Sequence, residues 1–92
     1  MMRAQVNSTG NRITLIVSGR LAEGWVPELE TCWRSARIEH PSGKILVDLK
    51  HVTFIDDTGC SLLERMHRDG ATFAAAGLMT RSIIDKIIRN EA

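Results

Sequence analysis

The sequence predicts a small α/β domain with one mixed β-sheet and helices packed on it. Two kinds of hydrophobic spacing support this prediction. In some segments apolar residues alternate with polar ones, and in others they recur every three or four residues. The segments follow the order ββαβαβα, which predicts an N-terminal antiparallel hairpin and parallel inner strands joined by right-handed crossovers. A chain of 92 residues has room for one core, so we treat residues 1–92 as one domain.

The opening hairpin is predicted from alternation and turn chemistry. Ile13, Leu15 and Val17 alternate with polar residues, which is typical of a strand with one buried face. Residues 7–11, with the sequence NSTGN, favour a turn, so the first strand is expected at residues 3–6.

The first helix is predicted to begin near Pro27, a residue suited to a first helical turn, and to end before residues 40–43. Four of its side chains recur at helical spacing and predict a buried stripe: Leu29, Cys32, Trp33 and Ala36. We therefore expect Trp33 to lie in the core.

The central strand is expected at residues 44–50. This segment is short and nearly continuous in apolar residues, as in an inner strand covered on both faces. A helix should follow over residues 58–69, with Gly70 as its stop signal. Three residues at its start offer N-cap groups: Asp56, Asp57 and Thr58.

The last strand is predicted from the glycines that flank it, and the last helix from the helical spacing of its apolar residues. Gly70 and Gly77 bracket residues 71–76, which are expected to form a strand, although the alanines of this segment would also suit a helix. Thr80 is then expected to cap a helix whose apolar stripe has four members: Ile83, Ile84, Ile87 and Ile88.

Composition excludes several classes of function. Twelve basic residues against eleven acidic ones leave a net charge of +1, so nucleic acid is not an expected partner. No apolar run approaches about 20 residues, so an integral membrane protein is not expected. No apolar leader follows the first residues, which favours a cytoplasmic location. The two cysteines do not form a disulfide framework, and we expect reduced thiols.

The sequence offers no convergent set of catalytic residues, metal ligands or cofactor-binding motifs, so we expect neither an enzyme nor a cofactor. The histidines His40, His51 and His67 are scattered, and Cys60 is expected to be a small buried side chain. The triplet Asp57-Thr58-Gly59 matches that of retroviral-type aspartic proteases. Those chains are almost wholly β, however, whereas the residues after this triplet have helical spacing.

Residues 45–59 resemble the signature of the STAS domain, the family of bacterial anti-sigma factor antagonists. The signature is an apolar strand ending Asp-Leu, a short Val-x-Phe-Ile-Asp loop, and two small polar residues before a Gly that opens a helix. Three further stretches agree with the family: residues 18–21, 26–29 and 77–78.

The resemblance implies a protein-binding regulator of transcription whose phosphorylated hydroxyl opens the helix after the central strand, which here is Thr58. The implied partner is an anti-sigma factor or a related serine/threonine kinase-type protein. It would dock on the loop-to-helix corner at residues 56–61, called the corner below. The implied contacts are Asp56, Asp57, Thr58, Gly59 and Ser61, with Glu23 beside them. Trp25, in the loop before the first helix, is a further candidate contact. A phosphate would add about −1.5 to −2 charges there, tolerated by the free N–H groups of the helix.

Other interpretations remain open at this point. Asp56, Asp57 and Thr58 would serve equally as plain helix caps, and Trp25 as a core aromatic that closes its loop. The same fold could work as a constitutive adaptor without phosphorylation, for example on a lipid-transport ATPase or in a stress-signalling complex. Binding of a nucleotide or small ligand at the strand ends is a third class. The chain stops two residues after Asn90, without the last strand and helix of longer family members, which favours a homodimer or a permanent partner.

Overall fold

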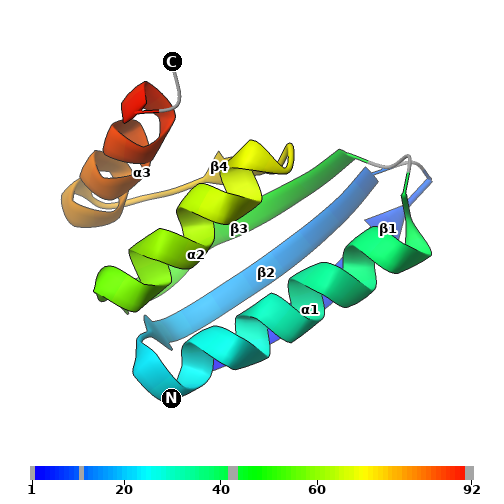
Figure 1. Ribbon diagram of the computed structural model, residues 1–92, viewed down its shortest axis with the longest axis horizontal. Coiled ribbons are helices and arrows are strands. Elements are labelled where there is room, and N and C mark those ends of the chain that lie inside the picture. Colours follow the sequence, from blue (N-terminus) through cyan, green and yellow to red (C-terminus); the bar gives the residue numbers. More distant parts are fainter. Residues whose placement is uncertain (1, 11, 42–43, 91–92) are drawn as a thin grey trace.

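Four strands form one mixed sheet, and helices pack against one of its faces (Figure 1). The computed structural model describes residues 2–10, 12–41 and 44–90. The strands lie in the order β1 (Met2–Thr9), β2 (Arg12–Leu21), β3 (Lys44–Ile55) and β4 (Thr72–Ala74). β1 is antiparallel to β2, while β2, β3 and β4 are mutually parallel.

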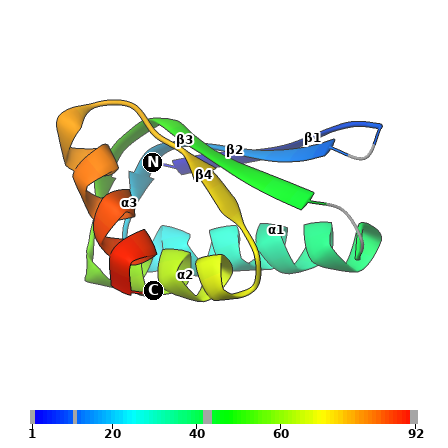
Figure 2. The ribbon, with the colours of Figure 1, turned by 90° about the horizontal axis from the view of Figure 1, so that it is seen from above.

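The described residues also form three helices: α1 (Val26–Glu39), α2 (Asp57–Arg68) and α3 (Leu78–Asn90), with a short 3-10 turn at Glu23–Trp25 ahead of α1. Figure 2 shows α1 and α2 beneath the sheet, and Figure 1 shows that they lie side by side, with α3 next to α2. The predicted mixed α/β architecture and the order ββαβαβα are confirmed.

The core is one layer between the sheet and the helices. Alternate residues of β2 and β3 point into it and are buried: Ile13, Leu15, Val17, Ile45, Val47 and Leu49. The helices contribute the stripes expected from their spacing, including Leu29, Trp33 and Ala36 of α1 and Leu62, Leu63 and Met66 of α2. Cys32 is half-buried at the margin of this stripe. The alternation of apolar residues in the strands and their helical spacing in α1 and α2 therefore correctly predicted which side chains form the core.

The prediction that β3 is covered on both faces was wrong. Leu46 points away from the helices and is 36% exposed, and Lys44 and Lys50 are also exposed. The helices lie on the opposite side of the sheet (Figure 2), so β3 buries only one face. The nearly continuous apolar run in this strand reflects one exposed leucine rather than a second core layer.

Several strands are longer than predicted. β1 continues through residues 7–9, which were expected to turn, because each pairs with β2 up to Thr9 opposite Arg12. β3 continues through residues 51–55, where a loop was expected, because β2 extends alongside it to the pair Leu21 and Ile55. Register shifts in β2–β3 pairing accommodate this length. Asn11, Ser42 and Gly43, part of the predicted turns, lie outside the described residues.

The two C-terminal elements also differ in their bounds. β4 covers only residues 72–74 of the predicted 71–76. α3 begins at Leu78, so Thr80 lies inside its first turn, where it is buried, and does not cap the helix. The backbone carbonyl of Gly77 instead accepts the N–H of Arg81, and Gly77 has a φ of +85°, a conformation that favours glycine.

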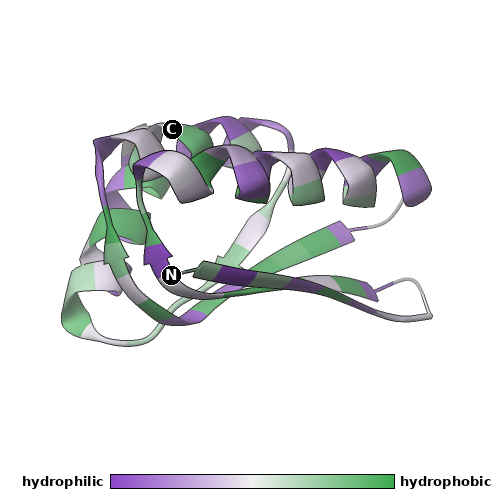
Figure 3. Ribbon diagram, turned by 90° about the horizontal axis from the view of Figure 1, so that it is seen from below, coloured by the Kyte–Doolittle hydropathy of each residue, from purple (hydrophilic) through white to green (hydrophobic). Residues whose placement is uncertain are grey.

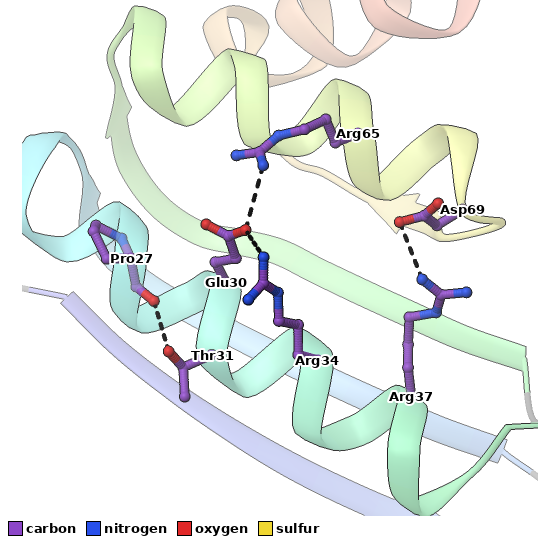
Figure 4. Close-up of polar contacts among 7 residues, drawn as sticks. All are labelled: Pro27, Glu30, Thr31, Arg34, Arg37, Arg65 and Asp69. Atoms are coloured by element: carbon purple, nitrogen blue, oxygen red, sulfur yellow. Dashed lines mark hydrogen bonds and ion pairs between the residues drawn. The ribbon is translucent and has the colours of Figure 1, made fainter.

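Surface ion pairs connect α1 to α2 (Figure 4). Glu30 accepts from Arg34 at 2.8 Å on its own helix and from Arg65 of α2 at 3.3 Å. Arg37 and Asp69 approach to 3.1 Å at the other end of the same helix pair. Every pair has at least one partner that is about half exposed or more, so each pair contributes little to stability, and the buried stripes hold the helices together.

Gly59 allows α2 to start directly against the end of β2. A Cβ atom at this buried position would lie 2.7 Å from the backbone oxygen of Leu21 and 3.1 Å from a methyl carbon of Ile55. Both neighbours belong to strand ends and cannot move freely. The approach therefore excludes any side chain, which explains physically why a glycine opens this helix.

We expect Gly59→Ala to destabilise the protein by about 1–3 kcal/mol, because the added methyl group overlaps backbone rather than a flexible side chain. Gly24→Ala is the matched control, since a Cβ there meets nothing within 4 Å and should change stability by less than about 0.5 kcal/mol. Urea unfolding of both variants tests this. Equal stability of the two variants would contradict the close approach.

Candidate functional site

The corner lies where β3 passes into α2, at the carboxyl ends of β2 and β3. Asp56 is the N-cap of α2: its Oδ1 accepts the backbone N–H of Gly59 at 2.8 Å. The same Oδ1 accepts the hydroxyl of Thr58 at 2.7 Å. The carboxylate thus occupies the first turn of the helix, as the capping interpretation predicts.

Asp56 also connects the corner to the loop between β2 and α1. Its Oδ2 accepts the backbone N–H of Glu23 at 2.9 Å, and its own N–H donates to the carbonyl of Leu21 at 3.1 Å. Glu23 has a φ of +33°, an uncommon backbone conformation for a residue with a side chain. The hydrogen bond that the Glu23 N–H donates to Asp56 helps hold that strained residue in place.

The pKa of Asp56 is lowered from the ordinary aspartate value, first by the Gly59 N–H and then by the Thr58 hydroxyl. The N–H groups of Glu23 and Thr58 lower it further, while burial acts in the opposite direction. Hydrogen bonds that favour the charged form of a carboxyl lower its pKa. Asp56 is therefore a carboxylate at neutral pH.

The structure brings the predicted contact residues together. Asp57, Thr58 and Ser61 are exposed on the first turns of α2, and Gly59 is buried beneath them. Glu23 is exposed beside them through its link to Asp56. The expectation that the N–H groups of the helix are free for a phosphate needs correction, because Asp56 already accepts the Gly59 N–H.

Trp25 is half-buried and packs against the core, as the structural interpretation of this residue predicts. It also borders an open hollow beside the corner whose other lining residues include Arg20, Glu23, Phe54 and Asp56. A single tryptophan thus closes the loop inside the molecule and contributes to the surface next to Asp56.

Sequence reasoning missed Arg20 and Phe54 in this hollow. They pair across β2 and β3, and the Arg20 guanidinium lies 4.8 Å from the centre of the Phe54 ring, within cation–π range. The pairing of β2 with β3 shifts by one residue just before Arg20, so the alternation of apolar residues could not predict that these two side chains lie opposite each other. Both residues lie in stretches that resemble the family, Phe54 in the signature and Arg20 in residues 18–21, and this resemblance was the available signal.

The other chemistry-bearing residues have structural surroundings. Burial, followed by the charges of Asp57 and Glu64, raises the pKa of the half-buried Cys60 thiol, so this cysteine is protonated at neutral pH. His67 stacks on Phe73 with ring centres 6.2 Å apart. Within residues 2–10, 12–41 and 44–90, no three His, Cys, Asp or Glu side chains are grouped to hold a metal. None of the helices over those residues is both long and apolar enough to cross a bilayer.

We expect Asp56→Ala to lower the thermal unfolding midpoint by several degrees at pH 7, because the first turn of α2 and the Glu23 loop lose their common acceptor. Asp57→Ala, an exposed neighbour, is the control and should have a much smaller effect. Because folding lowers the pKa of Asp56, its contribution is complete above the ordinary aspartate value and is lost as pH falls through the lower folded-state value. A gap between wild type and Asp56→Ala that persists at the lowest pH would refute this assignment.

The fold has clear relatives among solved structures, although neither a protein-family model nor a curated protein matches the sequence. An anti-sigma factor antagonist from Mycobacterium paratuberculosis superposes with a TM-score of 0.85 at 21% identity, over 99% of this chain and 81% of that one. The anti-sigma factor antagonist SpoIIAA in its unphosphorylated form gives 0.67 at 17% identity, over 90% and 82%.

A third similar structure, that of Mglu, gives a TM-score of 0.61 at 22% identity, over 80% of this chain but only 19% of that one. The two antagonist structures are matched along most of their length and share this arrangement of sheet and helices. The chain therefore has the fold of the anti-sigma factor antagonists, the STAS-domain fold.

Proposed function

We propose that the protein is a regulatory switch that docks a protein partner on the corner and is controlled by phosphorylation of Thr58. The observation that carries this proposal is the placement of the Thr58 hydroxyl. It is exposed on the first turn of α2 and lies 2.7 Å from the Asp56 carboxylate, which also holds the Glu23 loop. A modification at Thr58 thus acts directly on the group that joins the two parts of the surface.

In the unmodified protein the docking surface is pre-organised. Asp56 holds Gly59 and Glu23 at 2.8 and 2.9 Å, so α2 and the loop before α1 keep a fixed relation. Exposed Asp57 and Ser61 lie on the same helical turns. A rigid surface of this kind binds without a large ordering cost.

A phosphate on Thr58 would change this surface in two ways. It would replace the hydroxyl donor with an anion of about −1.5 to −2 charges beside the Asp56 carboxylate. It would also compete with Asp56 for the backbone N–H groups at the start of α2, since anions favour a helix N-terminus. Repulsion between the two anions weakens the hydrogen bond to Glu23, so the partner would lose both charge complementarity and a fixed surface.

The chemistry of the corner indicates the kind of partner. Glu23, Asp56 and Asp57 give it an acidic character, although the whole chain carries a net charge of only +1. An approaching surface therefore needs basic residues that pair with these carboxylates. We propose an anti-sigma factor of the serine/threonine kinase type, which would place the protein in cytoplasmic regulation of transcription. The likeness of the fold to anti-sigma factor antagonists supports this choice of partner.

One observation favours a second candidate function, that of a constitutive adaptor. The Thr58 hydroxyl already donates to Asp56, so it completes the helix cap even if no kinase modifies it. The corner would then bind a permanent partner, such as an ATPase subunit of a lipid transporter. Binding in that case would not depend on any modification of Thr58.

Capture from a native lysate with wild type, Thr58→Ala and Thr58→Glu separates the two functions. We expect Thr58→Ala and the unphosphorylated fraction of wild type to retain the same kinase-type partner, because neither carries added charge at the corner. Thr58→Glu should lower retention at least roughly tenfold, which corresponds to about 1.4 kcal/mol. Intact mass should show one phosphate on wild type and none on Thr58→Ala.

Ser35→Ala is the matched control, since Ser35 is an exposed hydroxyl residue of α1 that lies outside the corner. It should still accept phosphate and bind the partner. Equal capture by wild type, Thr58→Ala and Thr58→Glu, with no phosphate on any of them, would refute the switch and leave the adaptor.

A further inference from the structure

The outer edge of β1 offers an interaction surface separate from the corner. The strand order places β1 at one edge of the sheet, and its eight residues pair with β2 without a register shift. In an antiparallel strand, alternate residues turn their N–H and C=O groups to opposite sides, so half of these groups in β1 face outward. Figure 3 looks onto this edge: β1 lies in front and α1 lies above it.

β1 has only one of the features that usually protect an edge strand, the charge of Arg3. Edge strands are commonly blunted by short length, proline, charged side chains (lysine above all) or a bulge. β1 is long and regular, contains neither proline nor lysine, and carries Arg3 as its only charge. β4, at the opposite edge, has only three residues and cannot offer a comparable template.

The helix-facing side of β1 has an incompletely covered apolar row. Met2 is 7% exposed, Ala4 is partly exposed and Val6 is 47% exposed. These alternate residues point to the same face, so the cover provided by α1 diminishes along the strand. A further strand beside β1 would place side chains next to Val6 and bury more of it.

The sequence of β1 is compatible with pairing against itself. In an antiparallel pair centred on Val6, Arg3 lies opposite Thr9 and Gln5 lies opposite Asn7. In a pair centred on Gln5, Arg3 lies opposite Asn7. In both registers, Arg3 of one copy therefore does not lie opposite Arg3 of the other copy. This matters because like charges directly opposite each other destabilise an antiparallel pair. A net charge of +1 also leaves little repulsion between two copies.

We propose that two copies of the chain form a symmetric homodimer through antiparallel pairing of their β1 strands. The two four-stranded sheets then become one continuous sheet, with the Val6 side chains close to the two-fold axis. The corner takes no part in this contact, so the dimer is independent of the proposed switch.

Sedimentation equilibrium over a range of concentrations tests the proposal. Wild type should dimerise reversibly, and Val6→Lys should raise the dissociation constant at least roughly tenfold because it places two lysines near the axis. Thr72→Lys, an exposed position on the other edge strand, is the matched control and should leave the constant unchanged. Thermal unfolding checks that both variants are folded.

Amide hydrogen exchange of wild type gives a second readout that does not depend on any variant. Exchange of alternate β1 amides should slow as protein concentration rises, while β4 amides should not change. A wild-type protein that is monomeric up to about 1 mM would overturn the proposal, and so would a dimer that Val6→Lys does not weaken.

Discussion

The candidate site depends on the hydrogen bonds that the carboxylate of Asp56 accepts. One side chain accepts hydrogen bonds from Gly59 and Thr58 in α2 and from Glu23 in a loop 33 residues earlier in the chain. It can do so because Gly59 has no side chain and α2 therefore starts against the end of β2. Its charge is maintained by the same donors, which lower its pKa. Close packing and capping thus build one surface from two distant segments.

The helices lie on one side of the sheet, and this arrangement separates the apolar core from the polar candidate site (Figures 1 and 2). The polar groups of the corner lie at the carboxyl ends of β2 and β3, on Asp56 and the first turns of α2. The core itself contains almost no polar side chain among the described residues, Thr80 being the buried exception. A rigid apolar layer can then hold an exposed polar site in a fixed geometry.

Much of the fold could be predicted from the sequence because the apolar periodicities are clear. The prediction of β2 came from the alternation of Ile13, Leu15 and Val17 with polar residues. The prediction of α1 came from the helical spacing of Leu29, Trp33 and Ala36. Strand ends were less predictable, because pairing with β2 extends β3 as far as Ile55. Leu46 shows why the second face was misjudged: an apolar residue in a strand does not reveal whether a helix covers it.

The candidate site was predictable in part. The N-cap role of Asp56 is local, and three residues of sequence suffice to suggest it. Its bond to Glu23 and the pairing of Arg20 with Phe54 are not local, since they depend on where β2 and β3 end relative to each other. Neither residue spacing nor composition contains that information, and only the folded chain provides it.

The most direct test of the Asp56 link is an NMR titration of the backbone amide protons of Glu23 and Gly59 from neutral to acidic pH. If one carboxylate accepts both N–H groups, the two signals should shift together with a single midpoint below the ordinary aspartate value, and Asp56→Asn should abolish both transitions. Separate midpoints, or a Glu23 amide that does not respond, would contradict a carboxylate that joins the two segments.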